Sequence, residues 1–197
     1  MSIVRISELQ RLTTPTNGAL FYMAQGNGPT YSSSAITYDD LFGNVITTGS
    51  TRFFGSYSSS VTQTGTTNTE HLMTFNSLDA TNGCTWANGT QMIVSNPGSY
   101  NLQFSAQLYR VQGGTTENIY IWFKKNGQNV TNSNTAITFA NNGQYIVAAW
   151  NIIYPNLSSG DNVEIAWATT DSNIQIRALT PSLGPSIPSV IATLTQV

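Results

Sequence analysis

Charged side chains are scarce in this sequence. Seven Lys and Arg and nine Asp and Glu make up 8% of its 197 residues and leave a formal net charge of -2, whereas a typical soluble domain carries about 25% charged residues. No basic cluster is larger than Lys124–Lys125. Nucleic acids and anionic membrane surfaces are bound through clustered positive charge, so we expect neither as a partner.

Cysteine, histidine and long apolar runs are also nearly absent. The single Cys84 excludes an internal disulfide, and the single His71 excludes a metal site built from several histidines. No apolar run approaches the roughly 18 to 20 residues of a membrane span. The first ten residues lack the apolar core of a signal peptide, so we expect a chain that is made and released in a cytoplasm.

The residues that could carry out chemistry do not form a recognisable group. His71 is expected at a loop or strand edge, and Cys84, between a turn and a strand, is expected to be a small buried apolar residue. Asp79–Asn82 and Asp171–Asn173 could offer oxygen ligands to calcium, but neither is a complete calcium loop. We therefore expect no catalytic, cofactor-binding or metal site. A sugar depolymerase is the least favoured reading, because the carboxylates are scattered and glycoside hydrolysis needs two of them across a cleft.

Polar uncharged and β-branched residues dominate what is present. Thr, Ser and Asn account for 68 of the 197 positions, and 26 Ile and Val outnumber 12 Leu, a composition that favours strands. Residues 100–108 alternate between apolar and polar, which predicts a strand with one face in a core. From about residue 51, short strand patterns between turns are typical of a β-sandwich.

Two segments break this alternation and are apolar on both faces: residues 119–123 and 145–154. A strand of this kind needs cover on both faces. In a two-sheet sandwich the outer face meets water unless another molecule or a loop covers it, and a large exposed aromatic patch is unusual for a soluble monomer. We infer an oligomer; the alternative is that a loop of the same chain covers that face.

Turn signals and the last residues complete the predicted sandwich. Asn126–Gly127 and Asn142–Gly143 each predict a hairpin, because Asn-Gly accepts positive φ at both central positions. The final residues, 190–197, are strand formers, so we expect the last strand to be paired inside a sheet rather than left as a tail.

The first 43 or so residues differ from the rest. Apolar residues three apart in residues 3–12 suggest one or two helical turns, which Pro15 ends. Dense turn punctuation then leaves pieces too short to enclose a core. We expect this segment to order against something else.

Residues 52–197 contain five short motifs in a characteristic order. They are Thr62-Gln63-Thr64, residues 97–107, residues 121–127, Gly160-Asp161, and residues 185–191. Each motif is weak alone, but their order along about 145 residues resembles that of the C1q and tumour-necrosis-factor-like jelly rolls found in structural proteins of tailed phages. The resemblance implies an all-β, C1q/TNF-like jelly-roll β-sandwich at residues 51–197, preceded by an extended N-terminal arm at residues 1–50.

The family's jelly rolls form homotrimers around a three-fold axis lined with aromatic residues. Carried over to this chain, the resemblance implies a trimer interface, and the aromatic residues of the two doubly apolar segments that we expect there are Tyr120, Trp122 and Trp150.

The N-terminal segment is similar, more loosely, to short modules that begin many phage virion proteins. This likeness implies that the segment anchors the chain to the major capsid protein or another virion protein. The anchoring residues would be its apolar positions, Ile3, Ile6, Leu9, Leu12, Leu20, Phe21, Tyr38 and Leu41.

Together these likenesses imply a non-enzymatic virion protein. It would be a homotrimer on the capsid surface, assembled in the host cytoplasm, that acts as a decoration or cement protein or as a short head fibre. Two alternatives stay open: a tail fibre or receptor-binding tip that recognises a host-surface glycan, and a C1q-like lectin. Exposed Thr, Ser, Asn and Tyr suit carbohydrate binding, but they also suit an inert surface.

Overall fold

The computed structural model describes residues 20–25, 32–37 and 52–197. The chain divides into two units, Met1–Thr51 and Arg52–Val197. In the first unit, β1 (Leu20–Gln25) and β2 (Ser32–Thr37) pair antiparallel, with Leu20 opposite Thr37. The segment predicted to be an extended arm therefore contains a hairpin. In the sequence its two strands are separated by Gly26-Asn27-Gly28-Pro29, a strong turn signal.

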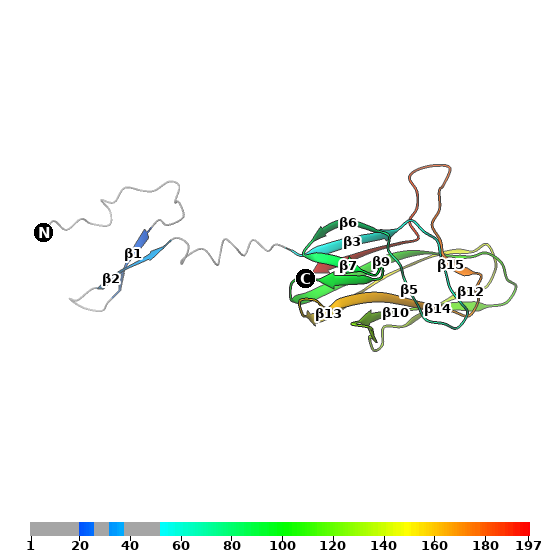
Figure 1. Ribbon diagram of the computed structural model, residues 1–197, viewed down its shortest axis with the longest axis horizontal. Helices are drawn as coiled ribbons and strands as arrows, with labels where there is room; N and C mark the ends of the chain where they lie inside the picture. Colours follow the sequence, from blue (N-terminus) through cyan, green and yellow to red (C-terminus); the bar gives the residue numbers. More distant parts are fainter. Residues whose placement is uncertain (1–19, 26–31, 38–51) are drawn as a thin grey trace. The chain divides into compact units, whose positions relative to one another are not determined.

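The second unit consists of two seven-stranded antiparallel sheets (Figure 1). The β10 sheet contains β5 (His71–Leu72), β7 (Cys84–Ala87), β8 (Gln91–Val94), β10 (Glu117–Lys125), β11 (Gln128–Asn129), β12 (Thr135–Phe139) and β14 (Asn162–Thr169). The β9 sheet contains β3 (Phe54–Ser59), β4 (Gln63–Thr64), β6 (Ser77–Asn82), β9 (Gly98–Arg110), β13 (Tyr145–Leu157), β15 (Ile174–Ile176) and β16 (Val190–Gln196).

The chain crosses repeatedly from one sheet to the other. It passes from β9 to β10 and β12, then to β13, β14 and β16, so that consecutive long strands lie in opposite layers. This alternation between two antiparallel sheets is the jelly-roll arrangement, and it confirms the predicted fold class. No helix of the described residues is long and apolar enough to cross a membrane.

The core lies between the two sheets and is filled by alternate residues of the long strands. On β9 the buried residues include Tyr100, Leu102, Phe104 and Leu108, as the predicted alternation requires. Phe104 packs edge to face on Phe123 of β10, with 5.8 Å between the ring centroids. An aromatic contact of this kind, joining opposite layers, stabilises the sandwich by about 1 kcal/mol beyond the area it buries.

The strand and turn predictions can be compared one by one. The last strand, β16, lies between β9 and β3, which confirms that it is paired inside a sheet. Asn126 and Gly127 have φ of 48° and 75° and join β10 to β11, as predicted. The hairpin predicted at Asn142–Gly143 is wrong, because the flanking strands β12 and β13 belong to different sheets. Gly143 takes a positive φ there, and its N–H donates to the carbonyl of Arg110, so the turn serves a crossover.

Candidate functional site

The titratable residues of the second unit have structural partners. The Nε2 atom of His71 accepts a hydrogen bond from the N–H of Thr66 at 2.8 Å, and its ring lies 5.2 Å from that of Trp167. Cys84 is buried, and burial raises the pKa of its thiol to about 11, which keeps it protonated and unreactive near neutral pH. These environments do not suit nucleophilic catalysis.

The carboxylates weighed as calcium ligands are engaged by protein groups. Asp79 Oδ1 accepts hydrogen bonds from the hydroxyls of Ser58 and Ser77. Asp171 accepts from the Arg110 guanidinium and from Asn173. Within residues 52–197 no three His, Cys, Asp or Glu side chains gather in a way that could hold a metal ion.

The aromatic residues predicted at the trimer interface do not share one surface. Tyr120 and Trp122 lie on the outer face of the β10 sheet, because Ile119, Ile121 and Phe123 between them face the core. Trp150 lies on the other sheet and turns inward, where its ring meets that of Phe104 edge to face at 4.7 Å. Alternation along each strand produces this separation: residues two apart share a face, but the two strands lie in opposite layers.

The predicted anchoring residues fall in the first unit. Leu20 and Phe21 lie in β1, and Ile3, Ile6, Leu9, Leu12, Tyr38 and Leu41 lie outside the described residues. Their anchoring role therefore stays a prediction.

The outer surface of the β9 sheet is uncharged over four adjacent strands. We define the β9 face as the outward residues of β13, β9, β16 and β3. They are Tyr145, Val147, Ala149, Asn151, Ile153, Asn101, Gln103, Ser105, Gln107, Tyr109, Ile191, Thr193, Thr195, Phe54, Ser56 and Ser58. None of them is charged. Depletion of charge is a property that distinguishes the centre of a protein interface from ordinary surface.

Large apolar side chains stand exposed on the β9 face. Tyr145, Val147 and Ile153 of β13 are 51%, 58% and 57% exposed, and Ile191 of β16 is 43% exposed. Tyr145, Val147 and Ile153 alternate with inward residues along β13, so these three side chains lie on the same side of the strand. Singly exposed apolar residues need no explanation, but several of them on one uncharged sheet face mark an interaction surface.

The strand that carries most of these residues lies at the edge of its sheet. β13 pairs with β9 along its length, and within residues 52–197 no strand pairs with its other edge. It is 13 residues long and contains no Lys, Arg, Asp or Glu. Isolated soluble proteins usually protect such an edge with charges or by keeping it short. Pro155 and the irregularity between Tyr154 and Leu157 protect only the end of the strand. The unprotected edge of β13 over Tyr145–Tyr154 is therefore the second sign of an interaction surface.

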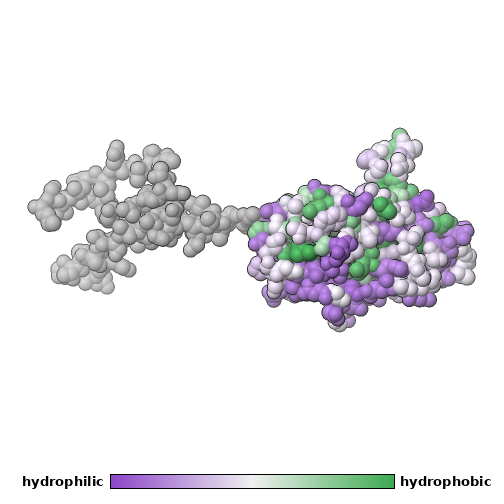
Figure 2. Space-filling model, viewed as in Figure 1, coloured by the Kyte–Doolittle hydropathy of each residue, from purple (hydrophilic) through white to green (hydrophobic). Residues whose placement is uncertain are grey.

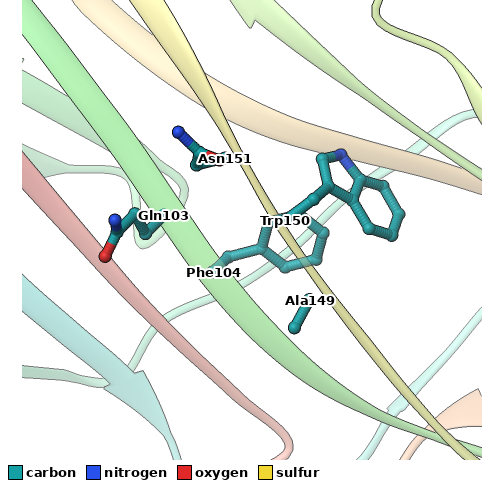
Figure 3. Close-up of a pocket in the computed structure, with 5 residues that line it drawn as sticks. All are labelled: Gln103, Phe104, Ala149, Trp150 and Asn151. Carbon is teal, nitrogen blue, oxygen red and sulfur yellow. The ribbon is translucent and has the colours of Figure 1, made fainter.

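Shallow hollows interrupt the β9 face on either side of Gln103. One, of about 280 Å³, is lined by Gln103, Phe104, Ala149, Trp150 and Asn151. Figure 3 shows the rings of Phe104 and Trp150 lying together, with Gln103 and Asn151 projecting away from them. A second, of about 230 Å³, is lined by Gln103, Phe104, Ser105, Ile191 and Thr193. The small residues Ala149 and Ser105 leave room there for side chains of another molecule.

At one end of the β9 face the side chain of Arg177 makes cation–π contacts with two tyrosines. The Arg177 guanidinium lies 4.2 Å from the ring centre of Tyr109 and 5.9 Å from that of Tyr145, and the two tyrosine rings are 4.3 Å apart. Beyond Arg177 a loop closed by backbone pairing of Leu179 with Ile187 projects from the sandwich (Figure 1). At its tip Leu183 is 87% exposed, and Figure 2 shows apolar surface there.

The sequence indicated that β13 is apolar on both sides, but not which residues stay uncovered. Tyr145, Val147, Ile153 and Ile191 were not among the residues predicted at the interface, which were Tyr120, Trp122 and Trp150. On β13, the even spacing of Tyr145, Val147 and Ile153 was a usable signal that they share one face. That β13 is an edge strand could not be read from its own residues, because this depends on which strands pair.

Comparison with known proteins gives little beyond the fold. No family model matches the chain, and no curated protein matches it. Among solved structures it is similar to murine APRIL at pH 8.0 and at pH 5.0, each with 11% identity and a TM-score of 0.48, and at pH 8.5, with 11% identity and a TM-score of 0.47. Each match covers 74% of this chain and 99% of the APRIL chain. An identity this low does not place the chain in a family.

Proposed function

We propose that this chain is a non-enzymatic structural protein of a tailed-phage virion. It would assemble as a homotrimer and attach to the capsid surface through residues 1–50. There it would serve as a decoration protein or short head fibre. The observation that carries the proposal is the uncharged β9 face, with its exposed Val147, Ile153 and Ile191 and its unprotected edge strand β13.

The composition of the β9 face favours a copy of this chain as its occupant. An uncharged surface with scattered apolar residues has no charge pattern that would select a partner of opposite sign. Around a three-fold axis each contact joins two different surfaces of neighbouring copies, and the Thr, Ser, Asn and Gln side chains of the β9 face can donate to or accept from whichever polar groups the next copy presents. In the proposed trimer we place the contact between subunits on the β9 face rather than at Tyr120, Trp122 and Trp150, which lie on different surfaces.

The separate first unit and the family likeness support the attachment to a virion. Residues 1–51 form a unit of their own in which the described strands are two six-residue strands. An isolated two-stranded hairpin is marginally stable in water. It gains order when it lies against a partner, and three such segments on one trimer bind more tightly than one through multivalency.

Sedimentation or light scattering of the full chain tests the trimer. The expected mass is three times the 21.3 kDa of one chain. The double variant V147D/I153D places two negative charges on the β9 face and should reduce the mass to that of a single chain, because each buried charge would lack a partner. The matched control is Val61→Asp, at a 55% exposed valine outside this face, which should leave the mass unchanged. A folded monomer of the unaltered chain would refute the trimer.

Attachment to the particle is tested with variants of the full chain. The double variant I6D/L9D should remain trimeric and fail to join phage particles that lack the protein. Thr13→Asp adds a charge to the same segment without removing an apolar residue, and should still attach. Incorporation of the I6D/L9D protein at the normal copy number would show that these residues do not anchor the chain.

A further inference from the structure

Beside Trp122, on the outer face of the β10 sheet, the chain builds a small hollow that the proposed virion role does not use. β11 pairs with Lys124–Lys125, and β12 pairs with residues 117–121 of the same strand. Between them, residues 130–134 leave the ladder and bulge outward opposite Trp122 and Phe123. The hollow has a volume of about 260 Å³ and is lined by Trp122, Asn129, Val130, Asn132, Ser133 and Asn134.

The bulge is held in place by the backbone of Phe123. The Phe123 carbonyl accepts a hydrogen bond from the N–H of Val130 at 2.9 Å, and the Phe123 N–H donates to Ser133 Oγ at 3.1 Å. The Ser133 hydroxyl in turn donates to the carbonyl of Val130 at 2.8 Å. These three hydrogen bonds fix the wall of the hollow before any ligand arrives, so little conformational entropy is lost on binding.

Trp122 lines the hollow, and the polar edge of its indole is already hydrogen-bonded. Its Nε1–H donates to Asn129 Oδ1 at 2.9 Å, which satisfies the only donor of the ring. Across the sheet Trp122 is paired with Ala166, and Tyr120 lies between Ala168 and Ala136. The cross-strand neighbours of the two aromatic side chains are thus alanines, while Lys124, two residues from Trp122 on the same face, is paired with Glu70. Tyr120 and Trp122 lie about 7 Å apart along the strand.

The lining of the hollow selects the chemistry of its ligand. None of its residues is charged, and the nearest cations on β10 are already paired, Lys124 with Glu70 and Lys125 with Asp161. The exposed amides of Asn132 and Asn134 each present a donor beside an acceptor, which matches neighbouring hydroxyl groups. An aromatic face attracts the slightly positive C–H groups of a sugar ring. An anion finds no cation here, and a purely apolar ligand would leave the amides unpaired.

We propose that this hollow binds one uncharged sugar ring of a glycan, with Trp122 packed on the C–H face of the ring and Asn132 and Asn134 bonded to its hydroxyls. The volume lies below the roughly 300–1,000 Å³ of pockets for drug-sized ligands, so it accommodates one ring, and Tyr120 is placed to contact the next. Single-site binding is weak, and several copies on one assembly raise the avidity. The site lies on the sheet opposite the β9 face and does not depend on the virion role.

Saturation-transfer NMR of the full chain with methyl glycosides of glucose, galactose, mannose and N-acetylglucosamine tests the proposal. At least one of these neutral probes should receive saturation, and Trp122→Ala should abolish the transfer. Asn134→Ala should weaken binding about fivefold, the effect of one hydrogen bond. The matched control Asn142→Ala, at an exposed asparagine on another surface, should leave binding unchanged.

Several outcomes would overturn the assignment. One is the absence of transfer to every neutral probe, and another is transfer that persists in Trp122→Ala. A third is Trp122-dependent binding of only the charged methyl glycoside of N-acetylneuraminic acid. A fourth is a loss of the trimer in Trp122→Phe, since it would place this residue in a subunit interface. If Trp122→Ala does not fold, Asn134→Ala and the double variant N132A/N134A carry the test.

Discussion

Arg110 shows how a single buried charge can be held in a sandwich with few charges. Its side chain is 1% exposed, and its Nε and Nη2 atoms donate to Asp171 at 3.0 and 2.9 Å. Burial on its own raises the pKa of Asp171, but hydrogen bonds from Asn173 and Arg110, together with the positive charge of Arg110, lower it overall. The pair therefore remains charged and joins the end of β9 to the turn after β14.

Removing one member of this pair should be costly. Arg110→Met leaves the Asp171 carboxylate without its cation, and we expect the free energy of unfolding to fall by about 3 kcal/mol. Lys125→Met is the matched control, because its partner Asp161 also loses a cation but the lysine side chain is 37% exposed; its effect should stay below about 1 kcal/mol. Urea unfolding of both variants measures the difference. Equal losses would contradict the role of burial.

Asp161 predicts how stability depends on pH. Hydrogen bonds from Asn126, from the Ser158 N–H and from Lys125 lower the pKa of Asp161 from 3.8 to about 2. As the pH falls, the Asp161 carboxylate is protonated in the unfolded chain at a higher pH than in the folded chain. The stabilisation is therefore complete above about pH 4 and is lost as the pH falls toward 2. Asp161→Asn should be less stable than the unaltered chain at pH 7 and should lose less stability between pH 4 and pH 2. Melting temperatures across this range test it, and parallel curves would refute it.

At the scale of the strand, the packing of β3 requires a glycine at residue 55. Tyr57 is fully buried, burial raises its pKa, and its hydroxyl donates to the carbonyl of Thr85 at 3.0 Å. Its ring lies over Gly55, where an added Cβ would stand 2.3 Å from the Tyr57 oxygen. Gly55 therefore makes room for the aromatic side chain two residues further along the same strand.

We expect Gly55→Ala to destabilise the sandwich by about 1 to 3 kcal/mol, because the tyrosine ring must move within a packed core. Gly114→Ala is the matched control, since nothing lies within 4 Å of its added Cβ, and it should change stability by less than about 0.5 kcal/mol. Urea unfolding followed by tyrosine absorbance measures both. An unchanged free energy of unfolding in Gly55→Ala would mean that the Tyr57 ring can adopt another position without cost.

A strand and its inward face could be predicted from the sequence where the alternation of apolar and polar residues within that strand was sufficient. The alternation in residues 100–108 predicted the inward face of β9, because side-chain direction follows from spacing alone. Features set by several strands were not predictable. The hollow beside Trp122 needs both β11 and β12 on one edge of β10, and the turn at Asn142–Gly143 was misread because its residues do not specify the sheet that follows.

At the scale of the whole molecule, the pattern of short strands between turns predicted the β-sandwich. The segments 119–123 and 145–154, which are apolar on both faces, favoured an oligomer, but they did not indicate which surface it would use. The locations of Tyr120, Trp122 and Trp150 depend on how the sheets stack, which no local pattern contains. The first 43 or so residues were predicted to differ because dense turn signals leave pieces too short to enclose a core.

The uncharged β9 face also predicts how the assembly responds to salt. Because no residue of this face is charged and Arg177 at its end is held on the rings of Tyr109 and Tyr145, screening should weaken association little. Between 50 mM and 1 M NaCl we expect the dissociation constant of the trimer to rise by less than about twofold, as measured by sedimentation at several concentrations. Dissociation at high salt would indicate that charged residues elsewhere hold the subunits together.

The open side of β13 has a consequence for how the protein must be produced. Among the described residues, one edge of β13 has no partner strand over Tyr145–Tyr154, and its N–H and C=O groups can pair with another extended polypeptide in additions that have no fixed end point. In the proposed trimer, closure of a ring by three copies would compete with this open-ended growth. At a low rate of synthesis the chain concentration is too low for trimers to form quickly, and monomers accumulate. At a high rate the concentration of monomers favours aggregation through the β13 edge. Yield should therefore peak at an intermediate rate of synthesis.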